Sequence, residues 1–284
     1  MKLHRETAEI FVPDGTPVEA ALARTTHMAV GAHQDDLEIM AFDGILKSFQ
    51  CDTCWFTGVV VTNGAGSPRA DLYSDYTDAQ MQVVRRREQK KAAVIGEYGA
   101  QVLLDYPSAV LKDSADPAPV EDLYALFELA QPEVVYTHNL ADKHDTHVAV
   151  TLRVIEALRR LPVEMRPRQL YGCEVWRDLD WMVDTDKVAF DVSTHQGLQA
   201  ALLGVFDSQV CGGKRYDLAT MGRRQANATY FASHDTDVAT GLIFAMDLTP
   251  LIEDPHLSVV TYAQGFITRL AQDVTARIQK FGGQ

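Results

Sequence analysis

A doubly wound α/β fold, with a mostly parallel sheet covered by helices on both faces, is predicted by the order of apolar segments along the chain. Short apolar or β-branched runs of strand length alternate with longer segments whose apolar residues recur at helical spacing. Strands that alternate with helices form parallel βαβ units. The 284 residues, 46% of them hydrophobic, are enough for one large domain with a buried core.

The alternation is most regular in the first 160 residues. Residues 28–32 (MAVGA) are predicted to form a buried strand, and residues 56–62 (FTGVVVT) a second one that ends at Asn63-Gly64. Helices are expected at 38–49 and 78–98. The remaining elements expected in this part are a strand at 101–104, a helix at 120–130, a strand at 133–137 and a helix at 143–160.

The two ends of the chain are less regular. Residues 1–27 are predicted to be an N-terminal extension, and residues 28–284 a single domain. Within this domain, 170–284 is expected to complete the pocket, with strands at 169–176 and 187–192 and a helix at 195–206.

Composition and charge restrict the class of partner. The chain has 26 basic and 39 acidic residues, a formal net charge of −13, which argues against a general binder of the nucleic-acid backbone. No apolar segment has the length of a bilayer span, and residues 1–10 lack the apolar stretch of a secretory signal. A cytoplasmic protein that binds a small molecule, without nucleic-acid or membrane partners, is therefore expected. The oligomeric state is not predicted.

The four cysteines do not indicate a disulfide framework. Cys51 and Cys54 form a C-x-x-C pair, but the pair follows a predicted helix and precedes a strand, the reverse of a thioredoxin-like arrangement. No role is assigned to it.

Two clusters of histidine and aspartate follow two of the predicted strands. His33, Asp35 and Asp36 come directly after strand 28–32, whereas His144 and His147 open the helix after strand 133–137. The two histidines are three residues apart, so they project from the same side of the helix. Because ligands bind at the carboxyl ends of the strands in such sheets, we expect both clusters to meet at one site.

Two imidazoles, one carboxylate and an open position are typical of a catalytic divalent metal. His33, Asp36 and His147 supply such a set. Asp35 would then remain free to take a proton from water. His144, one helical turn from the metal, would stabilise or protonate a tetrahedral intermediate.

The positions of His144 and His138 also predict the charge of the first and the role of the second. The start of a helix disfavours positive charge, so a protonated His144 would need a carboxylate such as Asp142 or Asp145 beside it. His138, at the end of its strand, is expected to pack there rather than to act as a fourth ligand, because three ligands already complete a catalytic set.

The paired motifs resemble those of the LmbE/PIG-L family of metal-dependent de-N-acetylases. The resemblance rests on Ala32-His33-Gln34-Asp35-Asp36 and on Asp142-x-His144-x-x-His147. Arg85-x-x-Glu88 and Asp207-Ser208-Gln209 also resemble family positions, so the similarity extends over about 28–248. It implies a Rossmann-like three-layer α/β/α sandwich and one zinc ion that serves in removing N-acetyl groups from amino sugars or related conjugates.

The resemblance also implies roles for individual residues. His33, Asp36 and His147 would hold the metal, Asp35 would be the general base and His144 the oxyanion partner. Arg85 matches a position that contacts the substrate. Asn63 is a further candidate for a substrate contact because of its place at the edge of the site, and the segments 64–76 and 174–184, with Trp176 and Trp181, are expected to shape the pocket.

Three positions depart from the family pattern. Gln34 replaces a proline, which changes loop stiffness but removes no reactive group. Thr146 replaces an aspartate that often precedes the third ligand, so the usual carboxylate partner at the start of this helix is missing. Phe206 replaces a histidine before Ser-Gln, so a polar role there is lost.

The expected function is a metal-dependent hydrolase that removes an N-acetyl group from a small amino sugar or glycoconjugate. One alternative is an amidase that acts on a thiol or antibiotic-like conjugate. Another is a non-catalytic sugar- or nucleotide-binding module on the same fold. The resemblance favours zinc, but a set of two histidines and one carboxylate also suits iron(II).

Overall fold

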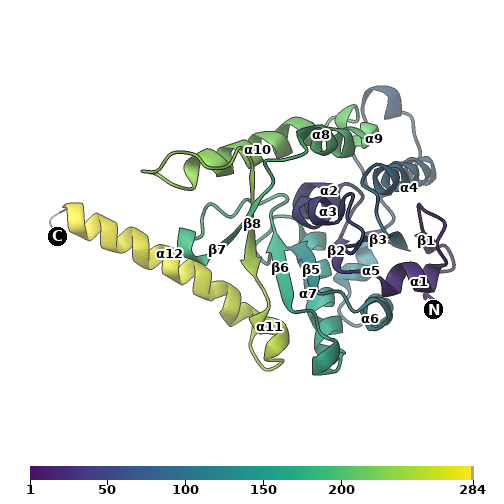
Figure 1. Cartoon of the computed structure of the whole chain (residues 1–284), viewed down its shortest axis with the longest axis horizontal. Helices are drawn as coiled ribbons and strands as arrows, with labels where there is room; N and C mark the ends of the chain where they lie inside the picture. The colour runs from purple at the N-terminus through teal and green to yellow at the C-terminus, as the bar shows by residue number, and fades with distance from the viewer. Residues whose placement is uncertain (283–284) are drawn as a thin grey trace.

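The computed structural model describes residues 1–282 as a central eight-stranded sheet between two layers of helices (Figure 1). The strand order is β1-β4-β3-β2-β5-β6-β8-β7. The strands are β1 (Glu9–Phe11), β2 (His27–Gly31), β3 (Phe56–Thr62), β4 (Ala100–Tyr106), β5 (Val134–His138), β6 (Gln169–Cys173), β7 (Lys187–Asp191) and β8 (Leu242–Asp247). The predicted α/β class with a mostly parallel sheet is confirmed.

The five central strands are all parallel. β2 pairs with β3 on one side, with Met28 opposite Thr57, and with β5 on the other, with Met28 opposite Val135. From β2 the chain builds outward through β3 to β4, and it later returns to the other side of β2 to add β5 and β6. The order therefore reverses between β2 and β5, and ligands bind in such sheets at this switch point.

The central parallel strands could be recognised in the sequence because they are buried on both faces. Every residue of β3 and of β4 is buried, as expected for parallel strands covered on both faces. Each fully buried valine or leucine in such a core contributes about 1.5–3 kcal/mol.

Helices cover both faces of the sheet. The core on one face contains residues of α1, α6, α7 and α11, and the core on the other contains residues of α2, α3, α4 and α8 (Figure 1). The helices are α1 (Val18–Ala23), α2 (Asp36–Met40), α3 (Phe42–Ser48), α4 (Asp78–Ile95), α5 (Ser108–Lys112), α6 (Ala118–Ala130), α7 (Asp145–Arg160), α8 (Gln196–Gly204), α9 (Asp207–Val210), α10 (Tyr216–Tyr230), α11 (Pro250–Glu253) and α12 (Val259–Gly282).

The single helix expected at 38–49 is wrong, because the structure has two helices, α2 and α3, that meet at Ala41. The buried guanidinium of Arg224, from α10, donates to the carbonyl oxygens of Glu38 at 2.8 Å and Ile39 at 3.1 Å. In an unbroken helix these carbonyls would bond to amide groups four residues further on. Arg224 takes their place and stabilises the end of α2.

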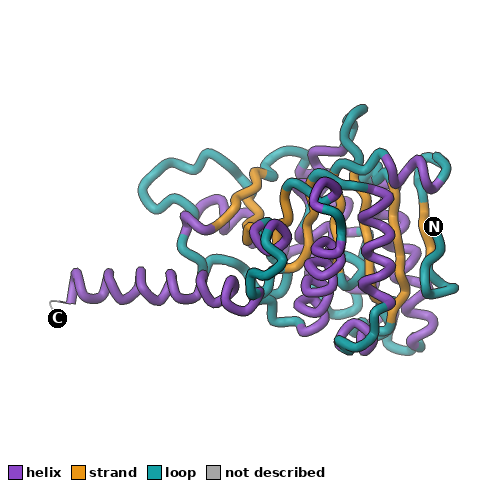
Figure 2. Tube along the Cα trace, turned by 90° about the horizontal axis from the view of Figure 1, so that it is seen from below, coloured by secondary structure: helices purple, strands orange, loops and turns teal. Residues whose placement is uncertain are grey.

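The predicted N-terminal extension, 1–27, lies against the sheet and the helices. β1 adds an antiparallel strand beside β4, and α1 packs on α6. At the other end of the chain, α12 extends away from the three layers (Figure 2). Among residues 1–282, no helix has the length and apolar character needed to cross a bilayer.

Candidate metal centre and active site

The two histidine and aspartate clusters meet at the switch point of the sheet. β2 ends at Gly31 and leads into His33, Asp35 and Asp36, and β5 leads into α7, whose first turn holds His147. His33 and His147 are 114 positions apart in the sequence, but the strands that precede them, β2 and β5, pair in parallel. The fold therefore brings the two clusters together.

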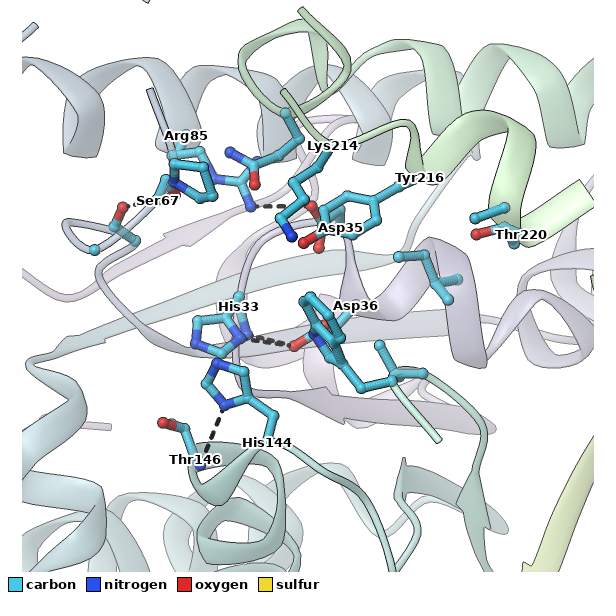
Figure 3. A pocket seen from close by; sticks show the side chains of 18 of the residues that line it. His33, Asp35, Asp36, Ser67, Arg85, His144, Thr146, Lys214, Tyr216 and Thr220 are labelled. Atoms are coloured by element: carbon cyan, nitrogen blue, oxygen red, sulfur yellow. Dashed lines mark hydrogen bonds and ion pairs between the residues drawn. The ribbon is translucent and has the colours of Figure 1, made fainter. Parts of the chain in front are cut away.

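Three donor atoms converge at this point. Nδ1 of His33 lies 3.2 Å from Nε2 of His147, and Oδ2 of Asp36 lies 3.3 Å from the first and 3.4 Å from the second (Figure 3 shows His33 and Asp36). Asp36 and His147 are buried, and His33 reaches the pocket.

These separations fit a metal site. Ligands bound to zinc at 2.0–2.1 Å with tetrahedral angles are about 3.3 Å apart. Two imidazole nitrogens facing each other at 3.2 Å can share only one proton, so a cation between them removes the repulsion of their lone pairs. The residues present therefore fit a divalent metal.

Asp35, two residues after His33, has a strained backbone conformation. Its φ of 83° lies in the left-handed region, which is rare for residues other than glycine. Two contacts hold it there: its backbone amide donates to Oε1 of Gln89 at 3.2 Å, and Nη2 of Arg85 donates to its Oδ2 at 3.1 Å. Strain of this kind persists only where surrounding structure fixes it, and it is common at active sites.

The two neighbouring carboxyl groups differ in acidity. Burial raises the pKa of Asp35 to about 7, although Arg85 opposes this effect. Burial alone would also raise the pKa of Asp36, but the rings of His147 and His138 hold it well below its usual range. One carboxyl group is thus suited to exchange a proton near neutral pH, and the other remains ionised.

His144 is the N-cap residue of α7. Its Nδ1 accepts a hydrogen bond from the amide of Thr146 at 3.3 Å, which in the neutral ring leaves the proton on Nε2 (Figure 3). Burial and the nearby rings of His33 and His147 lower the pKa of His144 to about 4. The ring is therefore a neutral hydrogen-bond donor that lines the pocket.

Asp142 is the carboxylate beside the histidines, and it faces His147 rather than the ring of His144. Its Oδ1 lies 3.5 Å from Nδ1 of His147 and accepts the backbone amide of His144 at 2.9 Å. Asp142 thus provides His147 with a carboxylate partner although Thr146 occupies the position where the family often has aspartate. Asp145 is exposed.

His138 packs at the end of its strand. Its ring stacks on that of His147 with centroids 3.8 Å apart. Its Nε2 lies 3.5 Å from Oδ2 of Asp36 but accepts the backbone amide of Ala32 at 2.9 Å. That lone pair is already used, so His138 is less suited than His33 to bind a metal.

The other two predicted site residues have different surroundings. Only 1% of Arg85 is exposed, and its guanidinium contacts Asp35, Glu88 and Gln34. Asn63 uses its side-chain oxygen to accept the amide of Ala65 at 3.2 Å. Within the described part of the chain, Asn63 is not part of the pocket wall.

A cavity of about 570 Å³ lies over these side chains. The expected loop contributes Gly64, Gly66, Ser67 and Pro68, and the expected segment 174–184 contributes Val175 and Trp176. Trp181 packs against the core instead. Gln209, from the Asp207-Ser208-Gln209 segment that resembles a family position, also lines the cavity. The cavity residues that were not predicted are Ile39, Ser108, Lys112, Lys214, Tyr216, Ala219, Thr220 and Arg223. No motif marks these residues, because the packing of α2, α5, α10 and the loop before α10 brings them there.

The C-x-x-C pair lies away from the site. Cys51 and Cys54 are free thiols in the loop before β3, at the amino end of the strand, whereas the cavity lies at the carboxyl ends.

Comparison with known families gives a match over the part of the chain that holds both clusters. Residues 28–158 match the PIG-L family model, described as GlcNAc-PI de-N-acetylase. The resemblance that was inferred from the sequence motifs is therefore confirmed over these residues. No curated protein sequence matches the chain.

Solved structures share the fold at low sequence identity. The 4-carboxy-2-hydroxymuconate hydratase GalB of Pseudomonas putida is 18% identical, with a TM-score of 0.59, and the match covers 82% of this chain and 98% of the hydratase. A conserved protein of Thermus thermophilus is 17% identical, with a TM-score of 0.60 and coverage of 83% and 100%. The N,N'-diacetylchitobiose deacetylase of Pyrococcus horikoshii is 14% identical, with a TM-score of 0.60 and coverage of 81% and 86%.

Proposed function

We propose that this chain is a metal-dependent hydrolase that removes the acetyl group from an N-acetylated sugar or glycoconjugate. The observation that carries the proposal is the convergence of His33, Asp36 and His147, whose donor atoms lie 3.2–3.4 Å apart with Asp35 beside them. The match of residues 28–158 to a de-N-acetylase family supports this reaction, as does a deacetylase among the structures with the same fold.

His33, Asp36 and His147 would hold one divalent metal, with zinc as the first candidate and iron(II) as the second. When bound, such a metal polarises a carbonyl group and lowers the pKa of water.

The side chains around this position would perform the proton transfers. Asp35 would accept a proton from the attacking water and pass it to the nitrogen of the leaving amine. The C–O bond would form first, giving a tetrahedral oxyanion, and the C–N bond would break once the nitrogen is protonated, so the products are acetate and a free amine. His144 would donate a hydrogen bond from Nε2 to the carbonyl oxygen as its negative charge develops.

The test combines metal content with amine release. Protein purified without chelator is analysed for zinc and iron, and the zinc-loaded protein is then incubated with N-acetylglucosamine and with N,N'-diacetylchitobiose. About one metal per chain and release of free amine would support the proposal. Folded protein that binds neither metal would overturn it, and the non-catalytic sugar-binding alternative would then be favoured.

The variant His147→Ala tests whether His147 is a metal ligand. Loss of one ligand should abolish stoichiometric metal binding, whereas Asp145→Asn, an exposed position on the same helical turn, should not. Unchanged metal content in His147→Ala would rule out the ligand assignment.

A further inference from the structure

Three positively charged side chains line the cavity outside the proposed metal site. Lys112 comes from α5, Lys214 from the loop between α9 and α10, and Arg223 from α10. Within residues 1–282, none of the three has a carboxylate oxygen within 4.0 Å. None of the three therefore forms an ion pair at this distance, and the one carboxyl group on which the charge of Arg223 acts, that of Glu174, lies outside this cavity.

This arrangement contrasts with the charge of the whole chain. The net charge is −13, and many basic residues elsewhere form ion pairs, as Lys187 does with Asp180 and Asp184. The carboxylates that line the cavity are those of Asp35 and Asp36. Arg85 pairs with the first, and the proposed metal would neutralise the second. The cavity is thus a positive region in an acidic protein, which attracts anions.

Lys214 and Arg223 are held on the same wall of the cavity. Nζ of Lys214 lies 5.0 Å from the centroid of the Trp176 ring, and Nη1 of Arg223 donates to the carbonyl oxygen of the preceding residue, Val175. The loop is fixed at Lys214, because the backbone amide of Lys214 donates to the backbone carbonyl oxygen of Gln209 at 2.9 Å. Lys214 thus lies against the ring of Trp176, and Arg223 binds the backbone of the residue before it.

The same wall is next to the proposed reaction centre. The ring of Trp176 lies 6.3 Å from that of His144 and 6.2 Å from that of Tyr216. Figure 3 shows Lys214 directed into the cavity beside Tyr216 and above His33. An anion between Lys214 and Arg223 would therefore belong to the molecule whose amide lies at His144 and Asp35.

We propose that the substrate is an N-acetylated sugar that carries an anionic group, a carboxylate or a phosphate, and that Lys214 and Arg223 bind this group beside Trp176. The inference rests on the proposed function, because it assigns a substrate class to the same site. Hydrogen bonds between such cations and an anion are about twice as strong as neutral ones. The face of Trp176 provides a surface on which a sugar ring can pack.

The test compares matched sugars on zinc-loaded protein. N-acetylglucosamine is neutral, N-acetylglucosamine 6-phosphate carries a phosphate, and N-acetylmuramic acid carries a carboxylate. The kcat/KM for amine release should be at least about tenfold higher for one of the charged sugars than for the neutral one. The charged sugar that is preferred identifies the anionic group. Equal kcat/KM values for all three would overturn the inference and leave the deacetylase proposal standing.

The double variant Lys214→Ala/Arg223→Ala should remove this preference. The matched control, Arg87→Ala/Lys91→Ala, deletes two exposed positive charges on the outer side of α4 and should retain it. If the double variant does not fold, Lys214→Ala alone is used, since this side chain is in a loop. A preference that survives the loss of Lys214 would overturn the inference.

A binding measurement separates this inference from the proposed function. Glucosamine 6-phosphate and glucosamine are titrated calorimetrically into zinc-loaded wild-type and variant protein. Tighter binding of the phosphate that depends on Lys214 and Arg223, without amine release from any sugar, would support the anion site and refute the deacetylase. Amine release without that dependence would refute the anion site alone.

Discussion

Nη2 of Arg85 lies 3.1 Å from Oδ2 of Asp35, and both side chains are buried. Nη1 of Arg85 is 3.6 Å from Glu88, whose carboxylate accepts the amide of Ser208 at 2.7 Å and its hydroxyl at 2.6 Å. Arg85 is therefore fixed between two carboxylates. This geometry indicates that it holds the proposed base in position. Arg85 also lines the cavity, so the substrate contact that the family resemblance implied stays a prediction.

We expect Arg85→Met to lower kcat by about 10–100-fold while leaving KM nearly unchanged, because the base loses its fixed position whereas only 1% of Arg85 is exposed at the cavity. The variant also leaves Glu88 without its cation, so the free energy of unfolding should fall by about 3–5 kcal/mol. Steady-state kinetics and urea unfolding measure the two effects, and zinc content should remain the same.

The control for this prediction is Arg87→Met, an exposed residue on the same helix, which should change neither quantity. A raised KM with unchanged kcat in Arg85→Met would instead assign Arg85 to the substrate.

Asp35→Asn should retain the metal and lose about 10²–10⁴-fold in kcat, the usual contribution of a general base. Asparagine has nearly the same shape and tolerates the left-handed conformation that Asp35 adopts at φ 83°, so the variant should fold. Zinc analysis and amine release are measured on the same preparation. Retention of full turnover would remove Asp35 from the reaction.

Asp142→Asn should weaken zinc binding by about 10–100-fold, because the carboxylate 3.5 Å from Nδ1 of His147 orients that ring and makes it more basic. Competition with a chromophoric chelator measures the affinity. Asp145→Asn is the matched control, since Asp145 is exposed on the same helical turn. Equal affinities in the two variants would contradict a role for Asp142 beside the metal.

The central strands could be predicted from the sequence because burial on both faces leaves continuous apolar runs. The break between α2 and α3 could not be predicted, because the arginine that takes the carbonyls of Glu38 and Ile39 is Arg224, about 185 residues further along the chain. β1 and β8 were missed too. β1 has three residues at the edge of the sheet, and β8 lies in the less regular part.

The proposed ligands could be predicted because His33, Asp36 and His147 belong to local motifs that directly follow strands at the switch point. Asp142 was recognised as a nearby carboxylate, but its distance from two histidines depends on how the loop before α7 folds. Lys214 and Arg223 have no such motif. Their place in the cavity depends on the packing of α10 and its preceding loop, which no local pattern specifies.

The contact between His4 and α6 gives a prediction about stability and pH. Nδ1 of His4 lies 2.8 Å from Oδ1 of Asp122, and its Nε2 lies 3.0 Å from Glu121. The hydrogen bond to Asp122, opposed by partial burial and supported by the charges of both carboxylates, raises the pKa of His4 above 6.5. The protonated ring thus attaches the N-terminal segment to the domain.

A histidine whose pKa is higher in the folded state stabilises the protein fully below its unfolded pKa of 6.5, and this contribution is lost as the pH rises through the higher folded value. We expect His4→Gln to be less stable than the wild type below pH 6.5, by less than about 1 kcal/mol because the ring is partly exposed. The difference should shrink above that pH.

Urea unfolding of the wild type and of His4→Gln over a pH series measures this difference in stability, and the pH dependence of metal binding cancels in the comparison. His256→Gln, at an exposed histidine, should give no comparable difference. A His4→Gln deficit that is constant with pH would show that packing, and not the charge of the ring, attaches this segment.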